Sequence, residues 1–215
     1  MGDNTVTLDK GKVAEEEAPF PLTDVDRWVL SQTDEEFHLH DWEELKVIIA
    51  TNKLETLKRK PSDLRRYMAW SADIKKQYGS MTNYLIQHRL PWGSPPFTYI
   101  STVPFKETPD YKILLNDWPY GLTPDITHIV VWSKTPIETD GTIGDVTEES
   151  RKIIEEFVKG TFAKRLGDAK RVTWFKNWVS LQSVRALEHV HVLVKDATKE
   201  DLEFWTGKNK ENEPK

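Results

Sequence analysis

The sequence predicts an α+β domain in which N-terminal helices precede a mainly antiparallel sheet with one long helix inserted. Three observations lead to this prediction. Apolar residues recur at helical spacing up to about residue 90, short apolar runs bounded by Pro, Asp and Gly follow, and one amphipathic stretch separates those runs. Helices first and strands afterwards is the order typical of an α+β fold. Residues 20–205 are expected to form this single domain, between disordered tails at 1–19 (acidic) and 206–215.

Four helices are predicted between residues 23 and 90. Thr23 is placed to cap the first, and Leu45 belongs to the apolar side of the second. Pro61 opens the third, whose apolar side recurs at helical spacing until Gly79 follows as a C-cap. The fourth contains Leu85 and ends in the proline-rich segment that follows it.

The second half of the chain supplies the sheet. Thr147 is expected to cap the inserted helix, whose apolar stripe is Ile153, Ile154, Phe157, Val158, Thr161 and Phe162. A short helix is predicted at residues 199–205. The predicted strands cover residues 111–116, 126–133, 172–175 and 189–194.

Composition excludes several classes of protein. The chain has 215 residues, a formal net charge of −5 and no cysteine, so disulfides and thiolate chemistry are excluded. The acidic balance gives no pull toward nucleic acid or an anionic membrane surface. No apolar run reaches the roughly 18–20 residues that span a bilayer, and the polar N-terminus does not have the form of a signal peptide. We therefore expect a cytoplasmic protein.

The segment from residue 174 to residue 194 is rich in hydrogen-bonding side chains, which a purely structural segment would not need. It ends in the predicted strand that contains His189 and His191. Because side chains alternate across a strand, both imidazoles are expected on one face, lining a cavity. Val190 and Val192 are expected on the other face, in the core.

Two further groups point to the same kind of site. The turn at residues 116–121 holds Trp118 and Tyr120, flat side chains that a turn does not need and that suit stacking on a base or sugar. His128, Trp132 and Lys134 share one face of their predicted strand. A ring beside a cation suits a phosphorylated aromatic ligand.

Candidate phosphate-binding cations are Arg89, Lys176 and Arg185, of which Arg185 is the strongest because it lies among polar side chains. A metal would have to be held by His, Asp and Glu. His189 and His191 have suitable spacing for this, with Glu188, His128 or Asp117 as a third ligand. His38 and His40 lie in a polar, acidic stretch and are expected to be exposed. The sequence has no zincin, P-loop or dinucleotide-binding motif.

Four ordered motifs carry a family resemblance: residues 89–92 (RLPW), 110–121 (DYKILLNDWPYG), 128–134 (HIVVWSK) and the segment 174–194. Together they resemble the fungal N-acetylglucosamine-induced protein 1 family, a domain of unknown function, over roughly residues 24–194. The resemblance implies a role in the amino-sugar response of fungi and names no reaction. Amino-sugar activation ends in a uridine-diphosphate sugar, so a uridine nucleotide is the ligand that this context suggests.

A second, partial resemblance is to the histidine-triad superfamily of nucleotide hydrolases and hexose-phosphate uridylyltransferases. Asn177, the run Gln182-Ser183-Val184 and the pair His189 and His191 are similar to its motif. Four residues separate that run from His189 where about one is usual, and Leu193 replaces the third histidine. The resemblance implies His191 as the catalytic nucleophile.

The sequence therefore predicts a protein that binds a uridine nucleotide, UTP or a uridine-diphosphate sugar, without rapid turnover. A divalent metal accompanying the phosphates is the one cofactor considered. The alternatives are nucleotidyl transfer through His191, a metal-dependent enzyme using His189 and His191, and a pure interaction module. The predicted ligand-binding residues are Arg89, Trp92, Asn116, Asp117, Trp118, Tyr120, His128, Trp132, Lys134, Lys176, Asn177, Gln182, Ser183, Arg185, Glu188, His189 and His191.

Overall fold

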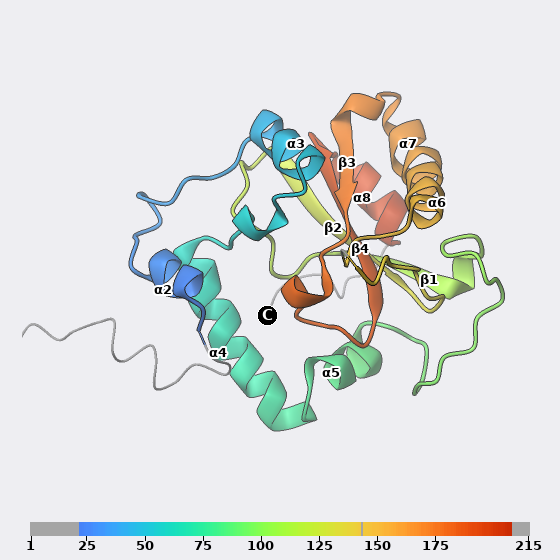
Figure 1. Cartoon of the computed structure of the whole chain (residues 1–215), viewed down its shortest axis with the longest axis horizontal. Coiled ribbons are helices and arrows are strands. Elements are labelled where there is room, and N and C mark those ends of the chain that lie inside the picture. The colour runs from blue at the N-terminus through green and yellow to red at the C-terminus, as the bar shows by residue number, and fades with distance from the viewer. Residues whose placement is uncertain (1–21, 143, 208–215) are drawn as a thin grey trace, which may run out of the picture.

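The computed structural model describes residues 22–142 and 144–207 (Figure 1). The predicted disorder of residues 1–19 and of residues 208–215 concerns segments outside these ranges. The short helix predicted at residues 199–205 extends one residue further in the structure, where Thr206 is its last residue and is buried. Its hydroxyl donates to the carbonyl of Leu202 at 2.7 Å, which continues the helix beyond the predicted end.

The predicted α+β architecture is confirmed, and helices precede a four-stranded sheet that is antiparallel throughout. In chain order the helices and strands are α2 (Asp24–Leu30), α3 (Trp42–Ala50), α4 (Pro61–Tyr78), α5 (Met81–His88), β1 (Tyr111–Leu115), β2 (Ile126–Ser133), α6 (Glu148–Val158), α7 (Lys164–Leu166), β3 (Val172–Phe175), β4 (Glu188–Lys195) and α8 (Lys199–Thr206). None of the helices in the described ranges combines the length and apolarity needed to cross a bilayer.

The helix ends follow local chemistry. The hydroxyl of Thr23 accepts the backbone N–H of Asp26, three residues into α2, and that of Thr147 accepts the N–H of Ser150 in α6. Gly79 ends α4 with a φ of 77°, a conformation that side chains other than hydrogen disfavour. These contacts lie within a few residues of one another in sequence, so helix boundaries were predictable from it.

The inserted helix is longer than α6 alone. A π-helical segment, Lys159–Ala163, joins α6 to α7, and its widened turn leaves the carbonyl of Thr161 to accept the indole N–H of Trp205 at 3.0 Å. Its apolar stripe faces the sheet, where Ile154 and Phe162 are fully buried. The pairing of this helix with α8 closes one side of the sheet (Figure 1).

The strand order is β1-β2-β4-β3, which places β2 and β4 in the middle. Alternation divides their side chains between two layers. Val190 and Val192 of β4 are fully buried against α6 and α8, as predicted. On the opposite face, Leu193 packs against α3. His189 and His191 also lie on this face, where they line a pocket together with residues of α4 and α5.

Candidate functional site

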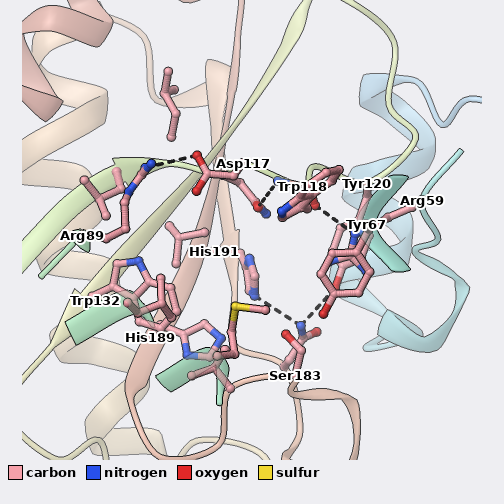
Figure 2. Close-up of a pocket in the computed structure, with 18 of the residues that line it drawn as sticks. Arg59, Tyr67, Arg89, Asp117, Trp118, Tyr120, Trp132, Ser183, His189 and His191 are labelled. Atoms are coloured by element: carbon pink, nitrogen blue, oxygen red, sulfur yellow. Dashed lines mark hydrogen bonds and ion pairs between the residues drawn. The ribbon is translucent and has the colours of Figure 1, made fainter. Parts of the chain in front are cut away.

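A cavity of about 130 Å³ opens on the face of the sheet that carries the two histidines. Its floor comes from β1, β2 and β4, and its walls come from α4, α5, the turn after β1 and the segment that leads into β4. Figure 2 shows His191 between two groups of side chains, with Arg59, Tyr67 and Tyr120 on one side and Arg89, Trp132 and His189 on the other. Elements far apart in sequence therefore build one pocket.

Ten of the predicted ligand-binding residues line this pocket, and they come from four separate segments of the chain. The ten are Arg89, Asn116, Asp117, Trp118, Tyr120, Trp132, Asn177, Ser183, His189 and His191. The other predicted residues do not line it. They are Trp92, His128, Lys134, Lys176, Gln182, Arg185 and Glu188.

Register explains how the histidines meet. In the β2–β4 pairing Trp132 lies opposite His189 and Val130 lies opposite His191, so His128 is the diagonal neighbour of His191. The His189 ring packs on Trp132 with 4.6 Å between ring centres. His128 Nε2 and His191 Nδ1 are 2.9 Å apart, within hydrogen-bond distance. His128 thus lies beneath the pocket and supports its floor.

Burial keeps all three imidazoles neutral. Desolvation lowers the pKa of His128 to about 3 and that of His189 to about 4, and it holds the pKa of His191 well below its ordinary value. The positive charge of Arg59 acts in the same direction on His128 and His191. Neutral imidazole both donates and accepts a hydrogen bond, so the tautomer of each ring decides what it offers to a ligand.

One arrangement of protons gives each donor of the His128–His191 chain an acceptor. The backbone N–H of Tyr120 lies 3.5 Å from His128 Nδ1, so this nitrogen must accept. The amide Nδ2 of Asn116 lies 3.3 Å from the same nitrogen and 3.2 Å from Nε2. His128 then donates from Nε2 to His191, whose own proton stays on Nε2. His191 Nε2 and the Tyr120 hydroxyl lie 3.2 and 3.1 Å from the side-chain amide nitrogen of Asn177. Rotating this amide group by 180° puts its oxygen in the same place, where it accepts a hydrogen bond from both. The half-turn gives Asn177 Oδ1 two donors and moves Nδ2 to the position that has no hydrogen-bond partner.

Of the three imidazoles on this face of the sheet, His189 is the one with a nitrogen, Nε2, that has no hydrogen bond to another described residue. Its Nδ1 lies 2.8 Å from the carbonyl of Leu187, which only accepts, so the proton is on Nδ1. Nε2 therefore carries a lone pair at the pocket. By contrast, both nitrogens of His191, the predicted nucleophile, are engaged by His128 and Asn177. In this geometry His189 is better placed than His191 to contact a ligand.

Two arginines reach the pocket. Arg59 donates from Nε to the carbonyl of Trp118 at 3.2 Å, and its guanidinium lies over the ring of Tyr67, 4.1 Å from the ring centre. No Asp or Glu among the described residues forms an ion pair with Arg59. Arg89 lies 3.1 Å from the carboxylate of Asp117 (Figure 2). Desolvation raises the pKa of Asp117 although Arg89 lies beside it. Because a carboxylate lies beside Arg89 and none among the described residues pairs with Arg59, the net positive charge at the pocket lies chiefly at Arg59.

The remaining predicted cations lie elsewhere. Lys134 is 3.5 Å from the buried carboxylate of Asp110 and donates to the carbonyl of Thr98. Buried Lys176 is 3.3 Å from Glu188. Arg185, the strongest phosphate-binding candidate in the sequence, is exposed and lies outside the pocket lining. Sequence neighbours suggested a polar enclosure for it, but the segment before β4 turns this side chain to the surface.

Sequence reasoning missed the wall formed by the N-terminal half of the chain. Arg59, Tyr67, Trp70 and Met81 line the pocket, and none was a predicted site residue. Two signals were present: Arg59 lies two residues before the helix that starts at Pro61, and Tyr67 and Trp70 are three residues apart on one side of it. Neither signal shows which part of the sheet that helix faces.

Two remaining observations concern polar atoms and metals. The indole Nε1 of Trp118, a pocket residue, is buried without a hydrogen-bond partner. In the described ranges no third His, Asp or Glu joins His189 and His191 as a potential metal ligand. The pocket is thus an aromatic, largely neutral cavity with one charged rim.

Comparisons with known proteins place the chain in a family. Residues 41–195 match the family described as "Protein of unknown function (DUF3605)". The chain is similar to N-acetylglucosamine-induced protein 1 of Candida albicans, with 30% identity over 172 residues that cover 72% of this chain and 68% of that protein. It is also similar to the uncharacterized protein YPL067C of Saccharomyces cerevisiae, with 28% identity over 169 residues that cover 77% and 84% of the two chains.

A solved structure, "Crystal Structure of HTC1", shares the fold with a TM-score of 0.64 and 27% identity, over 76% of this chain and 91% of that chain. The predicted resemblance to the N-acetylglucosamine-induced family is therefore confirmed, whereas the resemblance to the histidine-triad superfamily stays a prediction. The chain belongs to the DUF3605 family.

Proposed function

We propose that the pocket binds a uridine nucleotide, with the pyrimidine ring in the cavity and the phosphates at the arginine-bearing rim. The observation that carries this proposal is an aromatic cavity of single-ring size beside Arg59, a cation without a carboxylate partner among the described residues. Aromatic walls suit a base because stacking on an aromatic side chain is worth about 1–3 kcal/mol per base. A guanidinium without a carboxylate partner suits a phosphate because two parallel N–H groups match two phosphate oxygens.

The volume of the cavity favours a pyrimidine over a purine. An apolar cavity of about 150 Å³ holds benzene, a single six-membered ring. The cavity of about 130 Å³ is of the same order. A bicyclic purine would need the walls to move, at a cost that a pyrimidine avoids. The ribose and phosphates would extend through the open side.

The polar atoms at the pocket suit the pairing edge of uracil, which presents an N–H between two carbonyl oxygens. His189 Nε2 offers an acceptor for that N–H, because its tautomer is held by Leu187. The unpartnered indole N–H of Trp118 offers a donor for a carbonyl. A buried donor without a partner costs about 1–3 kcal/mol, which a ligand carbonyl would restore. Cytosine lacks the ring N–H and would leave His189 Nε2 unpaired.

We propose binding rather than nucleotidyl transfer. A nucleophilic imidazole needs one nitrogen free for attack and the other held by a neighbour. Both nitrogens of His191 are held, by His128 and Asn177. His189 has a free nitrogen, but its pKa of about 4 makes it a weak base at neutral pH. The name of the Candida albicans relative refers to induction by N-acetylglucosamine, the amino sugar carried in cells on uridine diphosphate, and this context supports the same ligand class.

The test is thermal shift and calorimetry with UTP, a uridine-diphosphate sugar, CTP and ATP. At 100 times its dissociation constant a ligand adds about 2.7 kcal/mol, which raises the melting temperature by roughly 5–10 °C in a chain of this size. Arg59→Gln should weaken uridine binding at least about tenfold, the loss expected when a charged hydrogen bond is removed. Arg185→Gln is the matched control and should bind as the unmodified protein does. A shift with ATP alone, or equal losses in the two variants, would contradict the proposal.

A further inference from the structure

A second cluster of potential ligands lies outside the pocket, where the chain enters α3. His38, His40 and Glu44 each offer a ligand atom, and these atoms all lie within 4.8 Å of one another. His38 Nε2 is 2.8 Å from Glu44 Oε2, and His40 Nδ1 is 3.7 Å from the same oxygen. None of the three residues lines the pocket described above. The cluster is therefore independent of the proposed nucleotide site.

The backbone on both sides of the cluster is held in place. The N–H of His40 donates to the carbonyl of Gly121 at 3.1 Å, and its carbonyl accepts the N–H of Thr123 at 3.0 Å. A Cβ atom at Gly121 would lie 2.4 Å from the ring of buried Phe37, so the segments that contain Phe37 and Gly121 are in close contact. The segment that carries the histidines is thus a bridge in the fold and not a loose loop.

Glu44 is held by the start of α3. Its backbone N–H donates to the carboxylate of Asp41 at 2.9 Å, and its own carboxylate accepts the N–H of Asp41 at 3.0 Å, a reciprocal capping box. This bond restricts the carboxylate to the side of the helix end where the imidazoles lie. Two of the three potential ligands, His40 and Glu44, are therefore placed by backbone contacts made close to each residue.

His40 has a buried ring nitrogen without a hydrogen-bond partner. Its Nδ1 is buried and has no hydrogen-bond partner, although the side chain as a whole is 19% exposed. Leaving such an atom unpaired costs about 1–3 kcal/mol. The nearest acidic oxygen, on Glu44, is too far away for a hydrogen bond. A capping box with one His–Glu ion pair explains His38 and Glu44, but it leaves this nitrogen unexplained.

We propose that His38 Nε2, His40 Nδ1 and the Glu44 carboxylate bind a divalent transition-metal ion of the Zn²⁺ type. Two imidazoles and one carboxylate form a recurrent three-ligand zinc set, with the fourth position open to water. Tetrahedral ligands at about 2.0–2.1 Å from the ion are about 3.4 Å apart. The two separations that involve Glu44, 2.8 and 3.7 Å, bracket this value, and one ligand atom from each of the three residues lies within 4.8 Å of the others. His38 is exposed, so its side chain can shift freely to complete the set.

The test is calorimetric titration of the tag-free, full-length protein with ZnCl₂, followed by Co²⁺ absorption spectroscopy. We expect one saturable Zn²⁺ site and the visible absorption of four-coordinate Co²⁺. His40→Ala and Glu44→Gln should each weaken Zn²⁺ binding at least about tenfold, since loss of even an outer-shell partner costs 10–100-fold. Glu44→Gln is informative because glutamine preserves the capping box, so the helix start and the fold are maintained.

His88→Ala is the matched control, because His88 is an exposed histidine at the end of α5, remote in sequence from the cluster. It should bind Zn²⁺ as the unmodified protein does. Absence of saturable binding in the unmodified protein would overturn the proposal. So would equal weakening in His88→Ala and His40→Ala, which would indicate nonspecific binding to surface histidines. Uridine binding is measured separately through Arg59→Gln, so failure of one proposal does not affect the other.

Discussion

Acidification from pH 8 to pH 5 should strongly destabilise this protein because of its three buried neutral histidines. His128, His189 and His191 have their pKa values lowered by burial from the ordinary 6.5. Between the folded and unfolded pKa values the unfolded chain binds more protons than the native protein, so stability falls as pH falls below 6.5. The loss is negligible above pH 6.5 and is complete once the pH reaches the folded pKa of each group.

The size of this loss of stability depends only on the pH and on the histidine pKa in the unfolded chain, because the three imidazoles stay neutral in the folded protein at pH 5. At pH 5 an imidazole that stays neutral in the native state and has a pKa of 6.5 in the unfolded chain destabilises the fold by about 2 kcal/mol. Three such groups give about 6 kcal/mol, comparable to the whole stability of many domains. Carboxylates contribute little in this window, since even Asp34, whose pKa is lowered to about 2, has an unfolded value of 3.8. Histidines therefore dominate the change between pH 8 and pH 5.

The assay is urea unfolding at pH 8, 6 and 5, followed by the fluorescence of the nine tryptophans. We expect the free energy of unfolding to fall by about 6 kcal/mol, with three protons taken up on unfolding. His189→Gln should be less stable at pH 8, yet should lose only about 4 kcal/mol over the same range because one titrating group is gone. A loss below about 2 kcal/mol in the unmodified protein would refute the reasoning, since at most one histidine could then be buried and neutral.

Two further predictions concern packing and a buried charge. Gly121→Ala should destabilise by about 1–3 kcal/mol, because the new Cβ would lie 2.4 Å from the Phe37 ring, whereas Gly141→Ala, with nothing within 4 Å, should stay within about 0.5 kcal/mol in the same urea titration. Asp110→Asn should cost about 3–5 kcal/mol at pH 7, because fully buried Asp110 accepts the N–H groups of Ile100 and Ser101 and lies 3.5 Å from Lys134. Loss of only a few tenths of a kcal/mol would show that the carboxylate is solvated in the folded protein.

Much of this architecture could be predicted from the sequence because it depends on neighbours in the chain. Strand alternation predicted that His189 and His191 share a face and that Val190 and Val192 lie in the core. Cap chemistry predicted that α6 starts after Thr147. Hydrogen bonds between residues three or four apart, and side-chain periods of 2 and 3.6, involve only neighbours in the chain. A single sequence is therefore enough to predict them.

Contacts between distant segments required the tertiary structure. The order β1-β2-β4-β3 makes His128 the diagonal neighbour of His191, a contact across 63 residues that occupies one nitrogen of the predicted nucleophile. The same packing brings Arg59 to the pocket from the start of α4 and turns Arg185 to the surface. A cation's role depends on whether a carboxylate or a cavity lies beside it, and no local pattern in the sequence specifies that neighbour.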